Sequence, residues 1–170
     1  MAFKFSRWTG WLLKILAYLV VVSIIMLAVD WYRSADVSTA IPDNSSTLRT
    51  LDGNTVSIVE QSYQAPVLLY FWATWCPYCE VVSPMVTSVA EDHQVLTIAF
   101  SSGTDSAVST FAAEQSYQFP IVNDETGVLA RRWGVSVTPT LLVVRNGEVS
   151  SVTTGLTTSL GMRARLELAR

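Results

Sequence analysis

Cysteine and histidine are scarce in this chain of 170 residues, which has two cysteines and one histidine, His93. A structural zinc site needs about four ligands, so carboxylates would have to supply most of them, and we expect no metal site. His93 lies near the end of a predicted helix and is expected to be an ordinary surface residue. Any sulfur chemistry must therefore come from the two cysteines.

Lysine is absent from most of the chain, because none follows Lys14. Residues 37–170 contain seven arginines and twelve acidic residues, a net charge of −5. This balance gives no case for nucleic-acid binding, and it disfavours close contact of this region with an anionic membrane surface. The same region has no ammonium group that could stabilise a thiolate.

Charged residues are also missing from one long apolar run. Every residue of Ile15–Val29 except Ser23 is apolar. With Trp11 to Leu13 added and Lys14 reaching the interface, the run approaches the roughly 20 residues that span a bilayer. Residues 11–30 are therefore predicted to be a transmembrane anchor. Three basic residues precede the run and one follows closely, so residues 1–10 are predicted to be cytoplasmic.

A cleaved signal peptide is the alternative for this segment, with 38–40 (Ser-Thr-Ala) as the best cleavage-like site. That site lies well beyond the apolar run, which favours the anchor. Residues 31–46 are small and polar and are interpreted as a linker. In either case the domain predicted over 47–170 faces the periplasm or its equivalent, where disulfides persist.

Strand and helix patterns alternate through residues 47–170. Strands are expected at Leu48–Leu51, Thr55–Val59, Val67–Phe71, Val95–Phe100, Phe119–Val122, Thr140–Val144 and Glu148–Thr153. Helices are expected over 76–91, from Thr104 or Asp105 to about 116, over 126–133, and at the C-terminus with Leu160, Ala164 and Leu168 on one face. Ser101-Ser102-Gly103 breaks one strand. The alternation predicts an α/β fold with a mixed central sheet flanked by helices.

The two cysteines, Cys76 and Cys79, lie between the buried-type strand Val67–Phe71 and an amphipathic helix. Cys76 is predicted to be the N-cap and Pro77 the first helical residue. Unpaired N–H groups and the helix dipole should lower the pKa of Cys76. We therefore expect Cys76 to attack a partner disulfide and Cys79, on the buried face, to resolve the mixed disulfide.

Two other interpretations of the cysteine pair remain. An ordinary structural disulfide would stabilise little, because the closed loop is so short. A copper-binding protein could instead use the two thiolates, since soft sulfur ligands suit Cu(I).

Residues 71–79, Phe-Trp-Ala-Thr-Trp-Cys-Pro-Tyr-Cys, resemble the active-site run of the thioredoxin superfamily, and the likeness extends over about 45–170. Pro84 matches that family's helix-bending proline, Pro139 its cis-proline and Gly155 a glycine after the last hairpin. The segment Ser101–Trp133 resembles the helix–strand insertion of the membrane-anchored TlpA and ResA branch. Within this branch, the anchor, linker and Cys-Pro-Tyr-Cys centre are most similar to the suppressor-of-copper-sensitivity group called ScsD.

The resemblance implies a membrane-anchored thiol–disulfide oxidoreductase that needs no cofactor beyond its own redox-active disulfide. It favours reduction of protein disulfides, with electrons from a membrane donor of the DsbD or ScsB kind. A disulfide-donating oxidase is the alternative direction.

Several site residues are also implied by the resemblance. The Thr138–Pro139 bond would be cis, and the Thr138 backbone would pair with substrate like an added strand. The Thr138 hydroxyl could also reach Cys76. Trp75 would form an apolar rim, unless it packs in the core, and Tyr78 would be exposed and contact partners.

One departure from the family concerns the proton of the resolving thiol. Thioredoxins have a buried aspartate six positions before the first cysteine, and this chain has Tyr70 there. Glu80, directly after Cys79, is a candidate substitute for proton transfer, although it could equally be an ordinary solvated helix residue.

Overall fold

The computed structural model describes residues 11, 14–18, 20–22, 24–25, 41–42 and 47–170. The described residues between Trp11 and Ile25 are helical. Within these ranges, no helix has the length and apolar character needed to cross a membrane. The predicted cytoplasmic segment 1–10, most of the predicted linker 31–46 and parts of the predicted anchor 11–30 fall outside the described residues.

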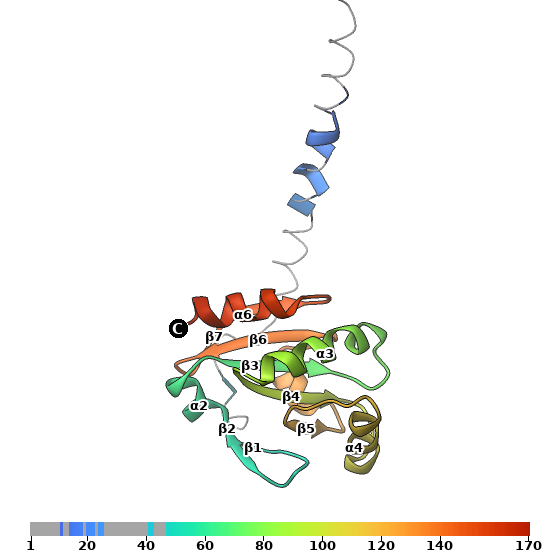
Figure 1. The fold of residues 1–170 in the computed structure, drawn as a ribbon, viewed down its shortest axis with the longest axis vertical. Helices are drawn as coiled ribbons and strands as arrows, with labels where there is room; N and C mark the ends of the chain where they lie inside the picture. Colours follow the sequence, from blue (N-terminus) through green and yellow to red (C-terminus); the bar gives the residue numbers. More distant parts are fainter. Residues whose placement is uncertain (1–10, 12–13, 19, 23, 26–40, 43–46) are drawn as a thin grey trace, which may run out of the picture. The chain divides into compact units, whose positions relative to one another are not determined.

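Strands and helices alternate from Thr47 onward (Figure 1). In chain order they are β1 (Thr47–Arg49), β2 (Thr55–Ser57), α2 (Ile58–Gln64), β3 (Val67–Trp72), α3 (Pro77–Ala90), β4 (Gln94–Phe100), α4 (Asp105–Glu114), β5 (Ile121–Asp124), α5 (Val128–Arg132), β6 (Thr140–Arg145), β7 (Glu148–Thr154) and α6 (Ser159–Leu168). Five strands form one sheet in the order β5-β4-β3-β6-β7. β3 is parallel to β4 and antiparallel to β6, which confirms the predicted mixed sheet.

The central strand β3 is completely buried because helices cover both faces of the sheet. Successive side chains of a strand point to opposite faces. The even-numbered residues from Leu68 to Trp72 pack with residues of α3, α4 and α6. The odd-numbered residues from Val67 to Phe71 pack with residues of α2 and α5. The described residues therefore form two apolar cores, one on each side of β3.

The first hairpin is confirmed, but its second strand is shorter than predicted. β1 and β2 pair antiparallel, with Thr47 opposite Ser57. The expectation that the strand continues to Val59 was wrong, because α2 begins at Ile58. The Ser57 hydroxyl accepts a hydrogen bond from the N–H of Glu60 at 3.3 Å, the Ser-x-x-Glu pattern of a capped helix start. Burial of Ile58 then favours the helix over an exposed strand.

Leu160, Ala164 and Leu168 lie on one face of the last helix, as predicted, and this face is exposed. Leu160 is 77% exposed, Leu168 is 89% exposed, and Ala164 is also exposed. Met162 and Leu166, each 1% exposed, occupy the core instead. Both sets recur at four-residue spacing, so periodicity fits either face. Packing against the sheet selects the second set.

His93 is not the surface residue that the sequence suggested. Its side chain is 11% exposed and lies between the carboxylates of Asp92, at 3.0 Å, and Glu167, at 3.4 Å. Arg163 of α6 donates to both oxygens of Asp92 at 3.1 and 3.2 Å. These bonds from Arg163, with a further contribution from His93, lower the pKa of Asp92 to about 2. The polar cluster joins α6 to the residues that follow α3.

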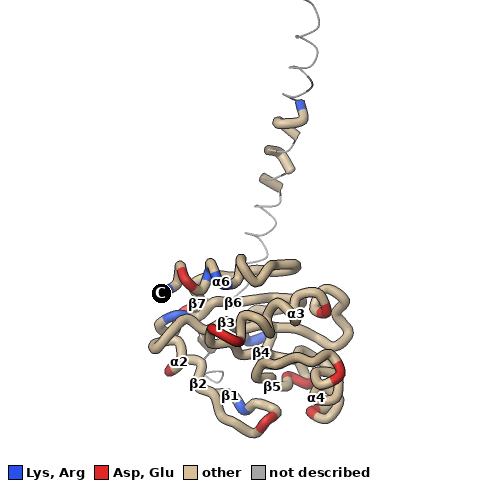
Figure 2. Tube along the Cα trace, in the orientation of Figure 1, with Lys and Arg blue, Asp and Glu red and all other residues tan. Residues whose placement is uncertain are grey.

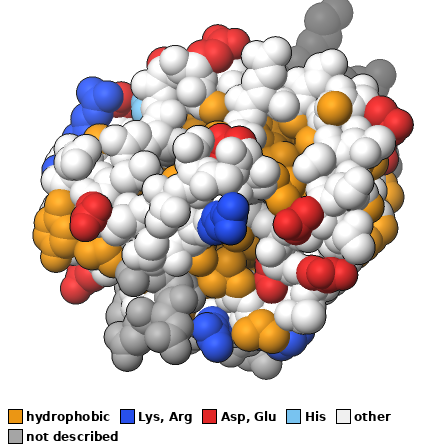
Figure 3. Space-filling view, turned by 90° about the horizontal axis from the view of Figure 1, so that it is seen from below, with side chains coloured by type: hydrophobic (Ala, Val, Ile, Leu, Met, Phe, Trp, Pro, Cys, Tyr) orange, Lys and Arg blue, Asp and Glu red, His pale blue; other side chains and the backbone are white. Residues whose placement is uncertain are grey.

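Charges of both signs are distributed over the domain surface. Acidic positions occur on α4 and in the turn between β1 and β2, close to a basic position on β1 (Figure 2). On the face seen in Figure 3, acidic and basic side chains are mixed with uncharged ones. This mixed pattern differs from the basic stripe that marks a nucleic-acid surface.

A buried carboxylate fixes the connection between β5 and α5. Asp124 is 6% exposed. Its two oxygens accept the N–H groups of Leu129, at 3.1 Å, and Ala130, at 2.8 Å. The N-cap residue Gly127 has no side chain to do this. Asp124 therefore satisfies two N–H groups that a helix start leaves without partners.

We predict that Asp124→Ala lowers the free energy of unfolding by about 1–3 kcal/mol, because two N–H groups of α5 lose their acceptor. Urea denaturation followed by circular dichroism measures the change. The matched control is Glu125→Ala, which removes the exposed neighbouring carboxylate and should stay within about 0.5 kcal/mol of the parent. Equal effects of the two substitutions would contradict the capping role.

Candidate active site

The junction between β3 and α3 holds both cysteines. Cys76 is the N-cap of α3 and has extended backbone angles, φ −98° and ψ 107°. Pro77 occupies the first helical position, where its missing N–H costs no hydrogen bond. The N–H of Cys76 donates to the carbonyl of Ala73 at 3.2 Å and closes the turn. The predicted strand-to-helix placement is confirmed.

Cys76 and Cys79 are joined in a disulfide, with their Cα atoms 5.3 Å apart. The backbone N–H of Cys79 points back and donates to Sγ of Cys76 at 3.3 Å. The same N–H, in the first turn of α3, also donates to the carbonyl oxygen of Cys76 at 3.0 Å, so the carbonyl and the sulfur share this donor. In the reduced protein, the same donor and the helix dipole would stabilise negative charge on Cys76.

The disulfide is almost covered, and two large aromatic side chains beside it are exposed. Cys76 is 3% exposed and Cys79 is 1% exposed. Trp75 is 59% exposed and Tyr78 is 61% exposed. Trp75 therefore lies at the rim rather than in the core, and the predicted exposure of Tyr78 is confirmed. Exposed apolar groups next to a reactive centre are typical of a contact surface.

The loop after β4 fixes the position of Trp75. The indole N–H donates to the carbonyl of Ser101 at 3.0 Å, and the ring meets Phe100 edge-on at 6.3 Å. The N–H of Thr74 donates to Oγ of Ser102 at 3.1 Å. Sequence reasoning treated these serines only as a strand break. The contacts join residues 26 and 28 positions apart, for which no local sequence signal exists.

Gly127 packs directly against this loop, and the sequence analysis did not single it out. Its φ is +69°, a value that glycine adopts without steric cost. A Cβ atom at this position would lie 2.6 Å from Cε2 of Phe100 and 2.9 Å from Oγ of Ser101. A larger residue here would displace the loop that holds the active-site tryptophan.

The loop before β6 reaches the same end of the sheet as the disulfide. The Thr138–Pro139 bond is cis, as the resemblance implied. Thr140 lies opposite Phe71 in the β6–β3 pairing, which places the loop beside the end of β3. The carbonyl of Pro139 accepts the N–H of Gly155 at 2.8 Å. Among the described residues, no hydrogen bond joins the Thr138 hydroxyl to a disulfide sulfur.

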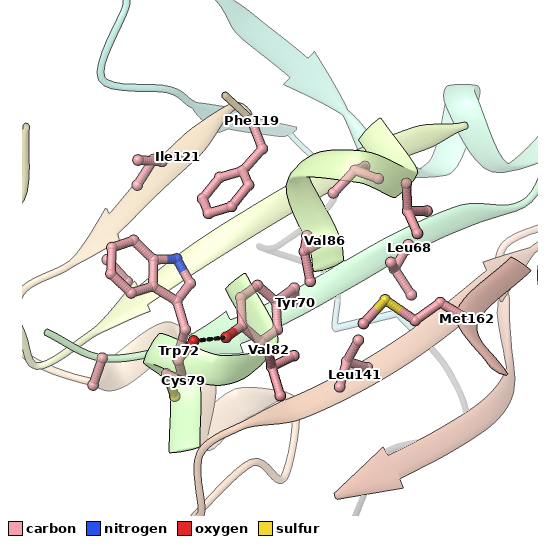
Figure 4. Close-up of a cluster of buried hydrophobic side chains, with 14 of the residues drawn as sticks. Leu68, Tyr70, Trp72, Cys79, Val82, Val86, Phe119, Ile121, Leu141 and Met162 are labelled. Carbon is pink, nitrogen blue, oxygen red and sulfur yellow. Dashed lines mark hydrogen bonds between the residues drawn. The ribbon is translucent and has the colours of Figure 1, made fainter. Parts of the chain in front are cut away.

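Tyr70 lies behind the active-site turn, fully buried against α3 (Figure 4). Its hydroxyl is 3.0 Å from Oγ of Ser83 and 3.5 Å from the carbonyl oxygen of Cys79. Burial raises the pKa of Tyr70 far above its ordinary value, so the phenol is neutral at physiological pH. Glu80, the predicted candidate for proton transfer, is exposed in the first turn of α3.

The arrangement supplies a pair of sulfurs that can alternate between dithiol and disulfide. One sulfur has a backbone donor directed at it, and the other lies one turn further into the helix. Within the described part of the chain, no group of three or more His, Cys, Asp or Glu side chains is placed to hold a metal ion.

Comparison with known proteins identifies the family. The model of the AhpC/TSA family matches residues 37–152. A thioredoxin-like protein of Haemophilus influenzae is 40% identical over 155 residues, which cover 91% of this chain and 89% of that protein. The thiol–disulfide oxidoreductase ResA of Oceanobacillus iheyensis is 28% identical over 154 residues, which cover 86% of this chain and 80% of ResA.

A solved structure shows the same fold. StoA from Bacillus subtilis superposes with a TM-score of 0.63 at 24% identity, and the match covers 70% of this chain and 93% of StoA. The structural match shows the fold, and the sequence matches show the family and the enzyme class. The chain belongs to the AhpC/TSA family and is a thiol–disulfide oxidoreductase with a thioredoxin-like fold.

Proposed function

We propose that this enzyme is a membrane-anchored reductase that acts on disulfides of partner proteins outside the cytoplasm. The observation that carries the proposal is the N–H of Cys79 directed at Sγ of Cys76, at the N-terminus of α3. A thiolate held in this way is the nucleophile of thiol–disulfide exchange. The redox-active disulfide itself is the only redox group that this reaction needs.

The reaction proceeds in two exchanges. The thiolate of Cys76 attacks one sulfur of a partner disulfide, forms a mixed disulfide and releases the other partner sulfur as a thiolate. Cys79 then loses its proton and attacks Sγ of Cys76, which breaks the bond to the partner. The partner leaves with both sulfurs reduced, and Cys76–Cys79 is oxidised. Two electrons have passed from the enzyme to the partner.

The loops around the disulfide suit a protein substrate. Trp75 and Tyr78 offer exposed apolar surface on either side of the sulfurs. The backbone of Thr138, next to the cis bond, would pair with an extended substrate chain as an added strand. Both features favour recognition of a polypeptide segment over recognition of a small thiol.

We favour reduction of partner disulfides over oxidation of partner thiols because the chain resembles the TlpA and ResA branch. A reductase of this type requires a donor that returns Cys76–Cys79 to the dithiol, and a membrane protein of the DsbD or ScsB kind would supply these electrons. The predicted anchor, the linker and the Cys-Pro-Tyr-Cys centre support a place in the ScsD group of this branch.

The apolar run supports anchorage of the N-terminus in the inner membrane. Its uncharged residues span 15–29, and basic residues are concentrated before it. The described residues of this region are helical. By the positive-inside rule, the N-terminus lies in the cytoplasm and the catalytic domain in the periplasm.

We predict that Cys79→Ser accumulates mixed disulfides between Cys76 and periplasmic proteins, because the resolving sulfur is gone while the attacking one remains. Non-reducing electrophoresis of acid-quenched cells shows these adducts. Cys76→Ser is the control and should trap few or none. If Cys79→Ser traps none but abolishes Cu(I) binding of the purified protein, the copper-binding interpretation replaces the oxidoreductase one.

The equilibrium reduction potential of Cys76–Cys79 distinguishes the two directions of electron flow. A reductase should have a potential at or below about −220 mV, in the direction of thioredoxin at about −270 mV. Titration of the purified protein against glutathione or dithiothreitol buffers gives the value. A potential near about −120 mV would instead indicate an oxidase that donates its disulfide.

Anchorage predicts that the full-length chain stays in the membrane after carbonate extraction and keeps its N-terminal sequence. Protease added to spheroplasts should digest the domain and spare the first residues. A soluble product whose sequence begins just after 38–40 would show a cleaved signal peptide and contradict the anchor.

A further inference from the structure

The hydroxyl of Ser102 ties the loop after β4 to the active-site turn. It accepts the N–H of Thr74 at 3.1 Å and donates to the carbonyl oxygen of Phe100 at 3.0 Å. A serine hydroxyl has one hydrogen to donate and lone pairs that accept, so both of its functions are in use here. Ser102 is 9% exposed. Removal of its hydroxyl would therefore leave two backbone groups without this partner in a place that water hardly reaches.

The same loop holds the ring of Trp75. The indole N–H donates to the carbonyl of Ser101 at 3.0 Å, and the ring meets Phe100 edge-on at 6.3 Å. Ser101 lies between Phe100 and Ser102, so the bond from the Ser102 hydroxyl to Phe100 closes the backbone around the carbonyl that the indole contacts. The orientation of Trp75 therefore depends on the hydroxyl of Ser102.

The backbone of Ser101 is fixed in an unusual conformation. Its φ is +45°, in the left-handed region that residues other than glycine seldom adopt. The N–H of Ser101 donates to the carbonyl of Asp124 at 2.9 Å. A Cβ atom at Gly127 would lie 2.9 Å from Oγ of Ser101, so glycine leaves the space that this side chain occupies. Such a conformation persists where the surrounding contacts enforce it, and the loop therefore holds one geometry.

Trp75 is thus ordered and exposed at the same time. Its side chain is 59% exposed, although a hydrogen bond and an aromatic contact fix its ring. Ordering a side chain during binding costs free energy, and a ring that is already fixed avoids this cost. A polypeptide with a disulfide covers the ring when its sulfur meets Cys76, whereas a small disulfide contacts little of it. The fixed ring therefore favours the larger substrate.

We propose that Ser102 is a specificity-determining positioning residue, which fixes Trp75 and thereby favours disulfides within polypeptide chains over small disulfides. The inference rests on the proposed function, because it concerns the disulfides that Cys76 attacks. The chemistry is the same for both classes of substrate. The substrate disulfide takes up two electrons and two protons, and the two thiols of the enzyme become the Cys76–Cys79 bond. The preference comes from contacts with the chain around the substrate disulfide.

The test uses the full-length reduced protein in detergent with a peptide disulfide and a small one. The peptide contains an internal disulfide and carries a fluorophore and a quencher, which separate when the disulfide is reduced. The small substrate is 4,4′-dithiodipyridine, which releases an absorbing thiopyridone. In rapid-mixing experiments, we expect Ser102→Ala to lower the second-order rate constant for the peptide about three- to tenfold. The rate constant for 4,4′-dithiodipyridine should equal that of the parent protein.

Ser62→Ala is the matched control, because it removes a hydroxyl with the same kinds of hydrogen bond at the other end of β6. Oγ of Ser62 donates to the carbonyl of Val59 at 2.7 Å and accepts the N–H of Gly147 at 2.9 Å. Ser62 is also buried. Both substitutions should lower the melting temperature, but only Ser102→Ala should lower the ratio of the peptide rate to the small-disulfide rate. A parental ratio in Ser102→Ala would overturn the inference.

A double-mutant cycle shows whether Ser102 acts through Trp75. Trp75→Ala alone should slow reduction of the peptide, and addition of Ser102→Ala should cause no further loss. If the two losses multiply, Ser102 acts independently of the tryptophan and the inference is wrong. If Ser102→Ala slows both substrates by the same factor, its effect is on Cys76 itself, which also contradicts the inference.

Failure of the proposed function has a different signature. In that case the parent protein would not reduce the peptide at all, and the inference would be lost with it. The inference alone fails if the parent protein reduces the peptide and Ser102→Ala reduces it equally fast.

Discussion

The hydrogen bond from the Cys79 N–H to Sγ of Cys76 depends on the position of one helix terminus, and that position depends on β3. β3 is buried on both faces and is held by β4 on one side and β6 on the other. β3 ends just before the cysteine turn. The two apolar cores hold β3 in place, and they thereby fix the position at which α3 starts. The stability of the fold and the reactivity of Cys76 therefore both depend on β3.

The active-site face is assembled from segments that only the sheet brings together. β3 leads into the cysteines, β6 begins at the cis-proline loop, and the loop after β4 holds Trp75. The segment Ser101–Trp133 contributes through this last loop, because Gly127 packs against Phe100 and Ser101. Hydrogen bonds from Thr74 and Trp75 to Ser102 and Ser101 connect this loop to the residues just before Cys76.

The sheet and the cysteine turn could be predicted because each has a local pattern, whereas the exposed aromatic rim was implied by the family resemblance. A continuous apolar run indicates a buried strand, and cysteine followed by proline suits a helix start. One error arose where two patterns competed, because at Ile58 a capped helix replaced a strand. In α6 periodicity fits two faces, and only packing decides that the Met162 face is the buried one. The buried environment of His93 and the Trp75–Ser101 bond are contacts between distant segments, which no short window of sequence contains.

The small exposure of Cys76 restricts the direction of attack. Exchange requires the attacking, attacked and leaving sulfurs to lie nearly in line, so a covered attacking sulfur reaches a partner disulfide along few trajectories. In the proposed reaction, a disulfide locked inside a rigid partner could not align with such a narrow approach. A disulfide in an extended, mobile segment could, so the proposed reaction would favour partners by the flexibility of the segment around their disulfide.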